Sequence, residues 1–532
     1  TRVEILIELG FFLFMVVYLK LHKFYRLLLM YHYISLMKFK FPSAQTILFI
    51  IAALVALMTW LVPAGKYDSL TYNSDSEVFE KTSLGITTSL NASQTTLDSL
   101  DIAIPLEKFT SGKIYKAIAI PKSYKKVDSN PQGFAAFLKS PIKGIIAAAD
   151  IIFLVLIIGG LIGIMNLSGS FDAGISRLAS ALKGREYILI ILVTVLIAIG
   201  GTTFGLAEET MAFYPILIPV FIAARYDAIV GLASVFLGSA IGTMCSTTNP
   251  FSAIIASDSA GINWTTGLYG RAVMLALCLI ITILYILRYA KRVKNDPSKS
   301  IVYDQKEELE SKFGFDMDNK LVLTGRHKLI LTVFTLCFVI MIIGVSMLDW
   351  WYVEMTTVFL VGSILIGLLA KLRESDFVEA FAKGAGDLLA VAFIIGIARG
   401  VSILMDDGQI SDTMLYYASG VTEGMNKGIF ANVMMVVYSI LSFFIPSSSG
   451  MAVLTMPIMA PLADTVGIGR EVVVNCYQYG MGLFYLINPT GLILASLAVV
   501  NIGFDKWLKF IMPLFIALVL VTMAVLTVSV YL

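Results

Sequence analysis

Long apolar runs separated by shorter polar or basic segments recur along this chain. The hydrocarbon core of a bilayer is about 30 Å thick and an α-helix rises about 1.5 Å per residue, so a spanning helix needs about 20 mostly apolar residues. The pattern predicts membrane helices over residues 44–62, 145–165, 187–199, 229–243, 267–290, 329–348, 351–370, 388–404, 429–444, 472–485, 491–500 and 508–530. It indicates an all-α polytopic protein of the cell membrane.

Three segments depart from this pattern. Residues 66–140 are rich in Thr, Ser, Asn and Lys, with short β-rich pieces around 113–120, and predict a small extramembrane segment. Residues 291–328 form a basic linker. Residues 1–36 contain Glu8 within their apolar run and no small-residue cleavage site, so they do not resemble a secretory signal. We treat them as an extension of unknown status.

Composition supports the membrane assignment and excludes several classes of protein. Hydrophobic residues make up 58% of the 532 residues, charged residues 14%, and mean hydropathy is +0.85. Soluble domains carry about 25% charged residues. The net charge of +2 implies no nucleic-acid partner. The four cysteines and three histidines show no spacing typical of a disulfide framework, a metal site or a catalytic triad, so we expect neither an enzyme nor a cofactor.

The basic loops predict the orientation of the helices, because cytoplasmic loops collect Lys and Arg. The residues that place the linker in the cytoplasm are Arg288, Lys291, Arg292, Lys294, Arg326 and Lys328. By alternation, residues 66–140 lie outside. The helix after Asp150 then runs inward, and the helix after Asp387 runs outward.

The two halves of the chain, residues 37–290 and 329–532, resemble each other in sequence. Matched blocks occur in the same order, shifted by 237 to 242 positions. They are residues 150–159 with 387–396, 214–219 with 456–461, and 249–257 with 488–496. Because the first pair of helices runs in opposite directions, we predict two inverted repeats. Such repeats are typical of secondary transporters, which bind substrate and coupling ion near the midplane at discontinuous helices.

Helix-breaking sequences occupy equivalent places in the two repeats. Residues 200–205 (GGTTFG) precede Glu208 and Glu209, and residues 446–450 (PSSSG) correspond to them. Each block is too short and too interrupted for a clean span, so we predict two re-entrant hairpins. Irregular backbone at that depth is tolerated only where protein or a water-filled cavity covers it.

A second pair of breaks is predicted at residues 247–250 (TTNP) and 488–490 (NPT). Free amides at half-helix N-termini suit a carboxylate, and free carbonyls suit a cation. The candidate ion ligands are Thr247, Thr248, Asn249, Ser449 and Asn488. Coupling to Na⁺, coupling to H⁺ and simple exchange all stay open.

Several longer motifs identify a family resemblance. They are residues 59–65 (TWLVPAG), 157–160 (IIGG), 205–219 (GLAEETMAFYPILIP), 245–250 (CSTTNP) and 444–450 (FIPSSSG). From about Met37 onward the chain resembles YfcC-type carriers of the C4-dicarboxylate anaerobic carrier (DcuC-like) family, within the ion transporter superfamily. The resemblance implies a homodimer with an elevator mechanism, in which a substrate-bearing domain with two hairpins moves against a scaffold. Members are assigned as basic amino acid or arginine/ornithine antiporters and as dicarboxylate carriers.

Ionisable residues in the predicted membrane core narrow the choice of substrate. A charge at mid-membrane costs about 2.5–3.5 kcal/mol on insertion scales, which makes such residues functional candidates. We expect Glu208 or Glu209 to bind a cationic head group or a coupling proton, while the hairpin amides and serines hold a carboxylate. This pairing suits a basic amino acid. The predicted substrate-binding residues are Glu208, Glu209, Thr210, Asn249, Arg399, Ser447, Ser448, Ser449, Asn488 and Thr490.

Other interpretations stay open. Glu208 or Glu209 could pair with Arg399 as a structural bridge, since buried charges usually pair. A C4-dicarboxylate or short-chain carboxylate would require protons or sodium to neutralise the two glutamates. A channel is one alternative, although it would not need the predicted pair of broken helices. An intramembrane enzyme is another, and it would need a base beside its nucleophile, but Ser447, Ser448 and Ser449 have no histidine near them in any recognisable arrangement.

Overall fold

The computed structural model describes residues 42–181, 184–313, 323–348, 350–421 and 425–531. The predicted extension 1–36 and residues 314–322 of the predicted linker lie outside these ranges. Within them, nine helices are long and apolar enough to cross a membrane. They are α2 (Ala44–Leu61), α6 (Ala149–Leu167), α12 (Leu268–Asn295), α14 (Gly325–Met347), α15 (Tyr352–Ala370), α17 (Leu389–Asp407), α19 (Lys427–Phe444), α20 (Ser448–Val466) and α23 (Phe504–Ser529).

Shorter helices lie between these spans. Three membrane helices were predicted at nearly the same bounds, namely α8 (Tyr187–Thr203), α10 (Ala228–Met244) and α21 (Arg470–Tyr485). The remaining ones are α3 (Gln94–Ser99), α4 (Leu106–Thr110), α5 (Phe134–Ala147), α7 (Ser170–Ala181), α9 (Tyr214–Ala223), α11 (Ile255–Ser259), α13 (Lys306–Phe313), α16 (Glu374–Asp387), α18 (Ser411–Val421) and α22 (Ile493–Val500), with four short turns η1 (Glu208–Phe213), η2 (Pro250–Ile254), η3 (Pro297–Lys299) and η4 (Tyr303–Gln305).

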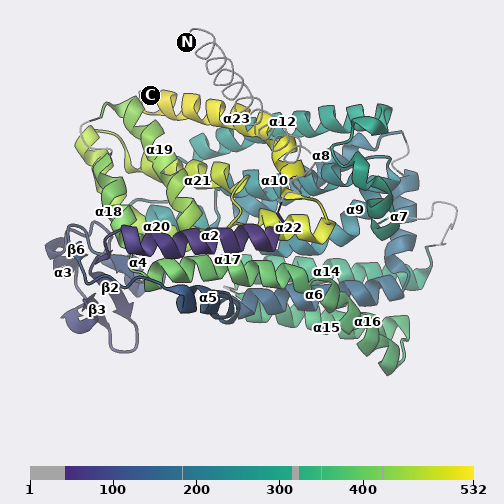
Figure 1. The fold of residues 1–532 in the computed structure, drawn as a ribbon, viewed down its shortest axis with the longest axis horizontal. Coiled ribbons are helices and arrows are strands. Elements are labelled where there is room, and N and C mark those ends of the chain that lie inside the picture. The colour runs from purple at the N-terminus through teal and green to yellow at the C-terminus, as the bar shows by residue number, and fades with distance from the viewer. Residues whose placement is uncertain (1–41, 182–183, 314–322, 349, 422–424, 532) are drawn as a thin grey trace, which may run out of the picture. The chain divides into compact units, whose positions relative to one another are not determined.

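The predicted extramembrane segment contains the strands, so the chain is mostly helical rather than all-α. Strands β2 (Ser69–Asn73), β3 (Val78–Ser83), β4 (Ile86–Asn91) and β5 (Ile118–Ala119) form an antiparallel sheet in the order β4-β3-β2-β5. Strands β1 (Gly65–Lys66) and β6 (Lys125–Lys126) pair separately. Figure 1 shows β2, β3 and β6 together at one end of the helices.

The β-rich pieces were expected around residues 113–120, but only β5 lies there. Strands β2, β3 and β4 lie earlier in the chain, between residues 69 and 91. The signal that identifies the earlier strands is a two-residue turn. Leu84 and Gly85 both have positive φ, 51° and 82°, between the paired residues Ser83 and Ile86. Positive φ at both central positions is the geometry of a tight β-hairpin turn.

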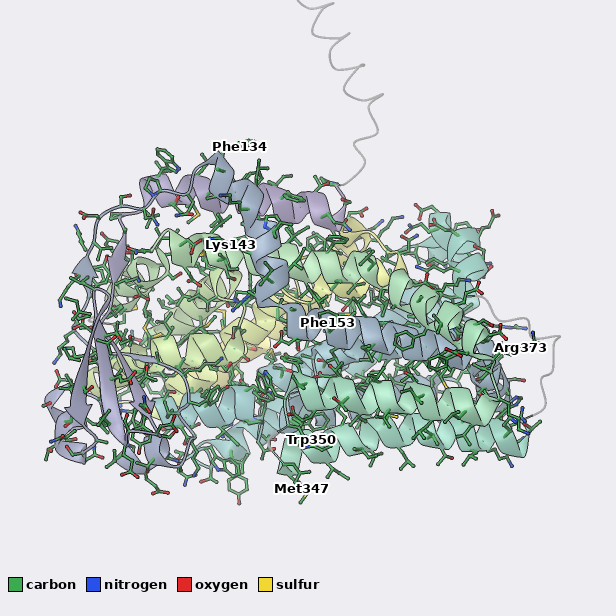
Figure 2. The ribbon with its side chains drawn as sticks, turned by 90° about the horizontal axis from the view of Figure 1, so that it is seen from below. Phe134, Lys143, Phe153, Met347, Trp350 and Arg373 are labelled. Carbon is green, nitrogen blue, oxygen red and sulfur yellow. The ribbon has the colours of Figure 1, made fainter. Side chains whose placement is uncertain are left out.

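One predicted span is divided into two helices. The expected helix over residues 145–165 corresponds to α6, which α5 precedes with only Ala148 between them. Figure 2 shows Phe134 and Lys143 on α5, which crosses the direction of the helix that carries Phe153. The apolar run alone did not reveal this change of direction, because the last turns of α5 are as apolar as the start of α6.

The element order from α5 to α12 recurs from α16 to α23. The two series exchange their first helices, since α5 packs against α17 and α16 packs against α6 (Figure 1). Glycines allow both contacts. A Cβ on Gly144 would lie 2.0 Å from the Gly396 carbonyl oxygen, and one on Gly384 would lie 2.2 Å from the Gly159 carbonyl oxygen. The two crossings therefore have the same close backbone approach.

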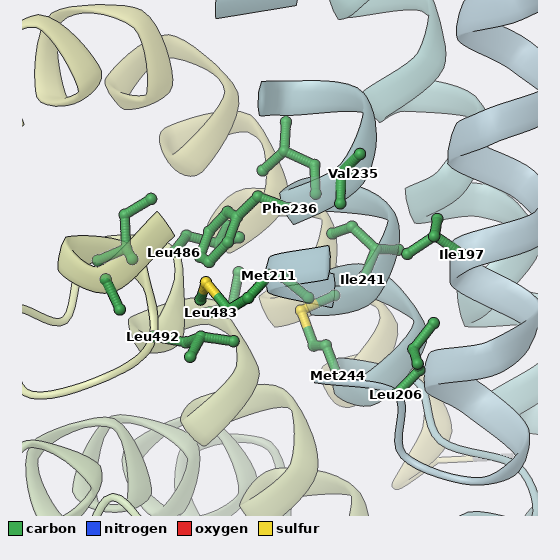
Figure 3. Packing of buried hydrophobic residues seen from close by; sticks show 14 of the residues in the cluster. Ile197, Leu206, Met211, Val235, Phe236, Ile241, Met244, Leu483, Leu486 and Leu492 are labelled. Carbon is green, nitrogen blue, oxygen red and sulfur yellow. The ribbon is translucent and has the colours of Figure 1, made fainter. Parts of the chain in front are cut away.

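The same correspondence holds for the helices that carry the breaks. A Cβ on Gly242 of α10 would meet the Ala198 oxygen of α8 at 2.3 Å, and one on Gly480 of α21 would meet the Met435 oxygen of α19 at 2.2 Å. Figure 3 shows the apolar core around these elements, where the labelled side chains of α8, α10 and α21 pack together. The breaks are thus held on tightly packed helix pairs.

Candidate functional site

The first predicted hairpin is α8 followed by η1 and α9. Helix α8 ends at Thr203, and Gly205 has a φ of 80°, which allows the chain to reverse. A Cβ at Gly205 would also lie 2.9 Å from the Asn249 Oδ1 atom, so glycine is required here for space as well as for conformation. The chain then enters the 3-10 turn η1 at Glu208.

The second predicted hairpin is α19 followed by α20. Helix α19 ends at Phe444, and Ser447 caps α20 by accepting a hydrogen bond from the Gly450 amide at 3.2 Å. A side-chain cap satisfies only part of the free N–H groups at a helix N-terminus, and the remainder carry partial positive charge. The start of α20 can therefore interact favourably with an anion.

Two asparagines hold the second pair of breaks in equivalent ways. The Asn249 amide nitrogen donates to the Gly201 carbonyl at 3.3 Å, and the Asn488 amide nitrogen donates to the Ser442 carbonyl at 3.1 Å. Each side-chain oxygen accepts from the backbone amide two positions later, at 2.8 Å for Asn249 and 3.0 Å for Asn488. Both side chains thus tie an unwound segment to the facing hairpin.

The two hairpins and the two breaks line one cavity of about 400 Å³. It is bordered by α6, η1, α15, α17, α20 and α21, together with the loop before α15 that contains Trp350. Figure 2 shows Trp350 close to Met347, the last residue of α14. The lining residues that carry charge are Lys116, Asp150, Glu208, Glu209 and Arg399.

Most of the predicted substrate ligands line this cavity. These are Glu208, Glu209, Asn249, Arg399, Ser447, Ser448, Ser449 and Thr490. Thr210 and Asn488 do not line it, and both side chains are buried and hydrogen-bonded within the protein. The Thr210 hydroxyl donates to the Ala207 carbonyl at 2.6 Å.

The predicted ion ligands do not all meet in the cavity. Asn249 and Ser449 line it, whereas Thr247, Thr248 and Asn488 do not. The hydroxyls of Thr247 and Thr248 donate to the carbonyls at the end of α8, at 3.2 Å and 3.4 Å. These threonines therefore support the tip of the first hairpin.

The two glutamates have different surroundings. The Glu209 carboxylate accepts a hydrogen bond from the Ala207 amide at 3.1 Å, which holds it against its own loop. The Glu208 carboxylate is half-buried, and it makes no ion pair and no hydrogen bond to another residue within the ranges that the structure describes. Arg399 makes no ion pair with either glutamate. Glu208 is thus the more available acceptor, and a structural bridge to Arg399 is not formed in this arrangement.

Several lining residues were not predicted as ligands. Asp150 was used only to align the repeats, although a carboxylate inside an apolar run is itself a signal of function. Lys116 lies in the polar segment, which contains many other lysines, so the sequence does not mark it as a ligand. Tyr352, Gln478 and Tyr485 also line the cavity. Their neighbours in sequence are typical of ordinary membrane helices.

Known proteins resemble this chain over nearly its full length. A protein of Haemophilus influenzae (strain ATCC 51907 / DSM 11121 / KW20 / Rd) is 45% identical, covering 92% of this chain and 97% of its own. "Putative basic amino acid antiporter YfcC" of Escherichia coli (strain K12) is 29% identical, covering 88% and 92%.

Two solved structures align with most of the chain. The YdaH transporter of Alcanivorax borkumensis is 12% identical, with a TM-score of 0.38, covering 92% of this chain and 98% of its own. MtrF of Neisseria gonorrhoeae, described among antimetabolite efflux pumps, is 14% identical, with a TM-score of 0.39, covering 94% and 97%.

The family comparison decides the identity of the chain. The family described as C4-dicarboxylate anaerobic carrier matches residues 41–531. This range contains both hairpins, both breaks and the cavity between them. A carrier family also excludes the enzyme and channel interpretations. The chain therefore belongs to the C4-dicarboxylate anaerobic carrier (DcuC) family and is a multi-pass secondary transporter of the membrane.

Proposed function

We propose that this transporter carries a basic amino acid such as arginine or ornithine. The observation that supports this most is the composition of the cavity, where Asp150, Glu208 and Glu209 occur together with the N-terminus of α20 at residues 447–449. A basic amino acid has a cationic side chain and a carboxylate. It therefore needs an acidic partner and an amide-rich partner in one site. The name of the YfcC relative agrees with this substrate class.

The chemistry of Glu208 and that of the α20 N-terminus both favour a basic amino acid. Glu208 has no partner among the described side chains, and a carboxylate in a low-dielectric site is stabilised by a cationic ligand. The free amides at the start of α20 favour a carboxylate ligand through their partial positive charge. Thr490 and Asn249 line the same cavity, although their side chains also bond to backbone.

A C4-dicarboxylate is the second candidate, and a specific observation favours it. Lys116 and Arg399 also line the cavity, and two cations suit a dianion. The three carboxylates in the same cavity would repel such a substrate unless protons or sodium ions neutralised them. This is why we rank the basic amino acid first.

We also propose two inverted repeats, with re-entrant hairpins at α8–α9 and α19–α20, moving by an elevator mechanism in a homodimer. The recurring element order and the equivalent glycine contacts support the repeats.

A cysteine-free variant carrying either Arg225→Cys, after α9, or Thr465→Cys, near the end of α20, tests the orientation. Both positions are exposed. An impermeant thiol reagent applied to intact cells should label only Thr465→Cys, and labelling of both would contradict inversion. Native mass spectrometry of the solubilised protein measures the oligomeric state.

Transport in proteoliposomes tests the substrate. Vesicles loaded with unlabelled arginine or ornithine should accumulate labelled arginine, and vesicles loaded with succinate should not. Imposed sodium and proton gradients then distinguish exchange from ion coupling. Uptake of labelled succinate without any uptake of arginine would overturn the proposal and favour the dicarboxylate.

A further inference from the structure

One cation in the cavity comes from outside the membrane helices. Lys116 lies in the extramembrane segment, in the loop between α4 and β5. Its Nζ atom donates a hydrogen bond to the Ser449 Oγ atom at 2.7 Å, at the tip of the second hairpin. Ser449 is itself buried. The extramembrane segment thus extends into the transport cavity.

The position of this loop is fixed by contacts on both sides of Lys116. On one side, Lys108 forms an ion pair with Asp258 of α11 at 2.6 Å, and the Asp258 side chain is 1% exposed. On the other side, β5 packs beside α20, with Ile118 fully buried. The lysine is therefore held at the hairpin tip by the fold rather than reaching it from a free loop.

The charges of the cavity form an acidic group and a basic group. Asp150, Glu208 and Glu209 lie around Tyr352, whereas Lys116 lies near Arg399. Neither Lys116 nor Arg399 forms an ion pair with any residue that the structure describes. Burial lowers the pKa of the Lys116 ammonium, and the charge of Arg399 lowers it further. An anion placed between these two cations would relieve both effects.

We propose that Lys116 is a substrate-binding residue, whose ammonium binds the carboxylate of the transported molecule beside the second hairpin. This inference rests on the proposed function, because it assigns the carboxylate of the amino acid to the basic group and not to the acidic group that contains Glu208. The lysine exchanges its bond with the Ser449 hydroxyl for a bond with the carboxylate. The ammonium attracts a carboxylate more strongly than a neutral hydroxyl, because opposite charges at contact distance in a low-dielectric site add a Coulombic attraction.

The test compares two ligands that differ only in the carboxylate. Arginine has it, and agmatine, the amine left when arginine is decarboxylated, does not. Binding to the full chain in detergent is measured through its intrinsic tryptophan fluorescence, to which Trp350 and Trp351 in the cavity lining contribute. Lys116→Gln should weaken arginine binding by about 10- to 100-fold and leave agmatine binding nearly unchanged. Lys116→Arg should restore most of the arginine affinity.

A matched control uses the same loop. Lys113 is exposed, and Lys113→Gln should bind both ligands as the wild type does. An equal loss of arginine and agmatine binding in Lys116→Gln would show a structural role and overturn the proposal. A gain in affinity would also overturn it, because the lysine would then be an occupant that competes with the ligand. Size-exclusion profiles of all three variants verify folding.

Succinate separates a failure of this inference from a failure of the proposed function. If the wild type binds succinate and neither arginine nor agmatine, the basic amino acid assignment is wrong. Lys116→Gln should then weaken succinate binding by a similar factor, which would retain the role of Lys116. Unchanged succinate binding in that variant would overturn the role of Lys116 as well.

Discussion

The two hairpin tips occupy equivalent places in the chain and differ in chemistry. The first turns at Gly205 and continues through a 3-10 turn that presents Glu208 and Glu209. The second is capped by Ser447 and passes directly into α20. At the positions that correspond to the two glutamates, the second hairpin has Gly450 and a fully buried Met451. One tip is acidic, and the other is an amide-rich helix start.

The helices that support the tips are far more alike than the tips themselves. Gly144 and Gly384 make equivalent crossings, and Asn249 and Asn488 make equivalent hydrogen bonds. The recurring elements therefore build a frame, and the tips differ in the residues that they present to the cavity. Under the proposed function, this difference suits an asymmetric ligand. The predictions below test each half of that comparison.

The largest effect is expected from removing the charge that distinguishes the first tip. Glu208→Gln keeps the shape of the side chain and should lower the rate of arginine exchange at limiting substrate by about 10- to 100-fold, because a charge-assisted contact is lost. Glu307→Gln, on the exposed face of α13, is the matched control. Initial rates of labelled arginine uptake into proteoliposomes measure the difference. Normal exchange by Glu208→Gln would show that the acidic tip is not a ligand.

Alanine substitutions at Gly144 and Gly384 test whether the two helix crossings contribute equally to stability. In Gly144→Ala and Gly384→Ala the new methyl group overlaps a backbone oxygen, so each should destabilise the fold by about 1–3 kcal/mol. Gly386→Ala in α16 has no atom within 4 Å of the added group and should not destabilise it. Chemical denaturation in detergent measures all three. A large effect at one crossing and none at the other would contradict an equivalent frame.

Substitution of Asn249 and Asn488 tests whether these side chains stabilise the fold or contact the substrate. Asn249→Ala and Asn488→Ala each leave buried backbone groups without a partner, and should cost about 1–2 kcal/mol of stability. The exposed Asn295→Ala, at the end of α12, serves as the control. Denaturation is compared with the ratio of arginine to succinate uptake. If that ratio changes while stability does not, the asparagine is a ligand rather than a cap.

The smallest effect concerns the extramembrane segment, whose Lys116 contacts the second tip. Burial raises the pKa of Asp68, but hydrogen bonds from Ser83 and Lys81 and the charges of Lys125 and Lys81 outweigh it, so the pKa lies below its usual value. A lowered folded-state pKa stabilises the fold above pH of about 4 and stops doing so as pH falls through that pKa.

The thermal midpoint of the wild type should therefore exceed that of Asp68→Asn near neutral pH, and the difference should shrink as the pH falls below about 4. Thermal denaturation between pH 3 and 7 measures it. A difference that grows as the pH falls would contradict the assigned sign.

The sequence predicted the frame well because apolar runs and helix breakers are local signals. The bounds of α8, α10, α19 and α21 agree with expectation to within a few residues. The amphipathic helices α16 and α18 were missed, since their mixed composition resembles that of loops. The strands around Gly85 were missed because the segment was interpreted from its polar character alone.

The site was predicted less completely for a different reason. Glu208 and Arg399 stand out as charges among apolar residues, and both line the cavity. Thr210 and Asn488 carry suitable groups, but the backbone uses them, and only three-dimensional contacts reveal this. Lys116 is far from the hairpins in sequence. The proposed role of Lys116 depends on how the extramembrane segment packs against α20, which the sequence alone does not reveal.

The exchanged helices bear on how the protein is made. Because α5 rests on α17 and α16 rests on α6, neither half of the chain can complete its own packing. During synthesis, Gly144 of α5 lacks its partner helix α17 until more than two hundred further residues have been translated. We expect the ribosome-bound first half to depend on insertion chaperones over this interval. Two half-chains produced together should assemble into an active carrier, whereas either one alone should be degraded.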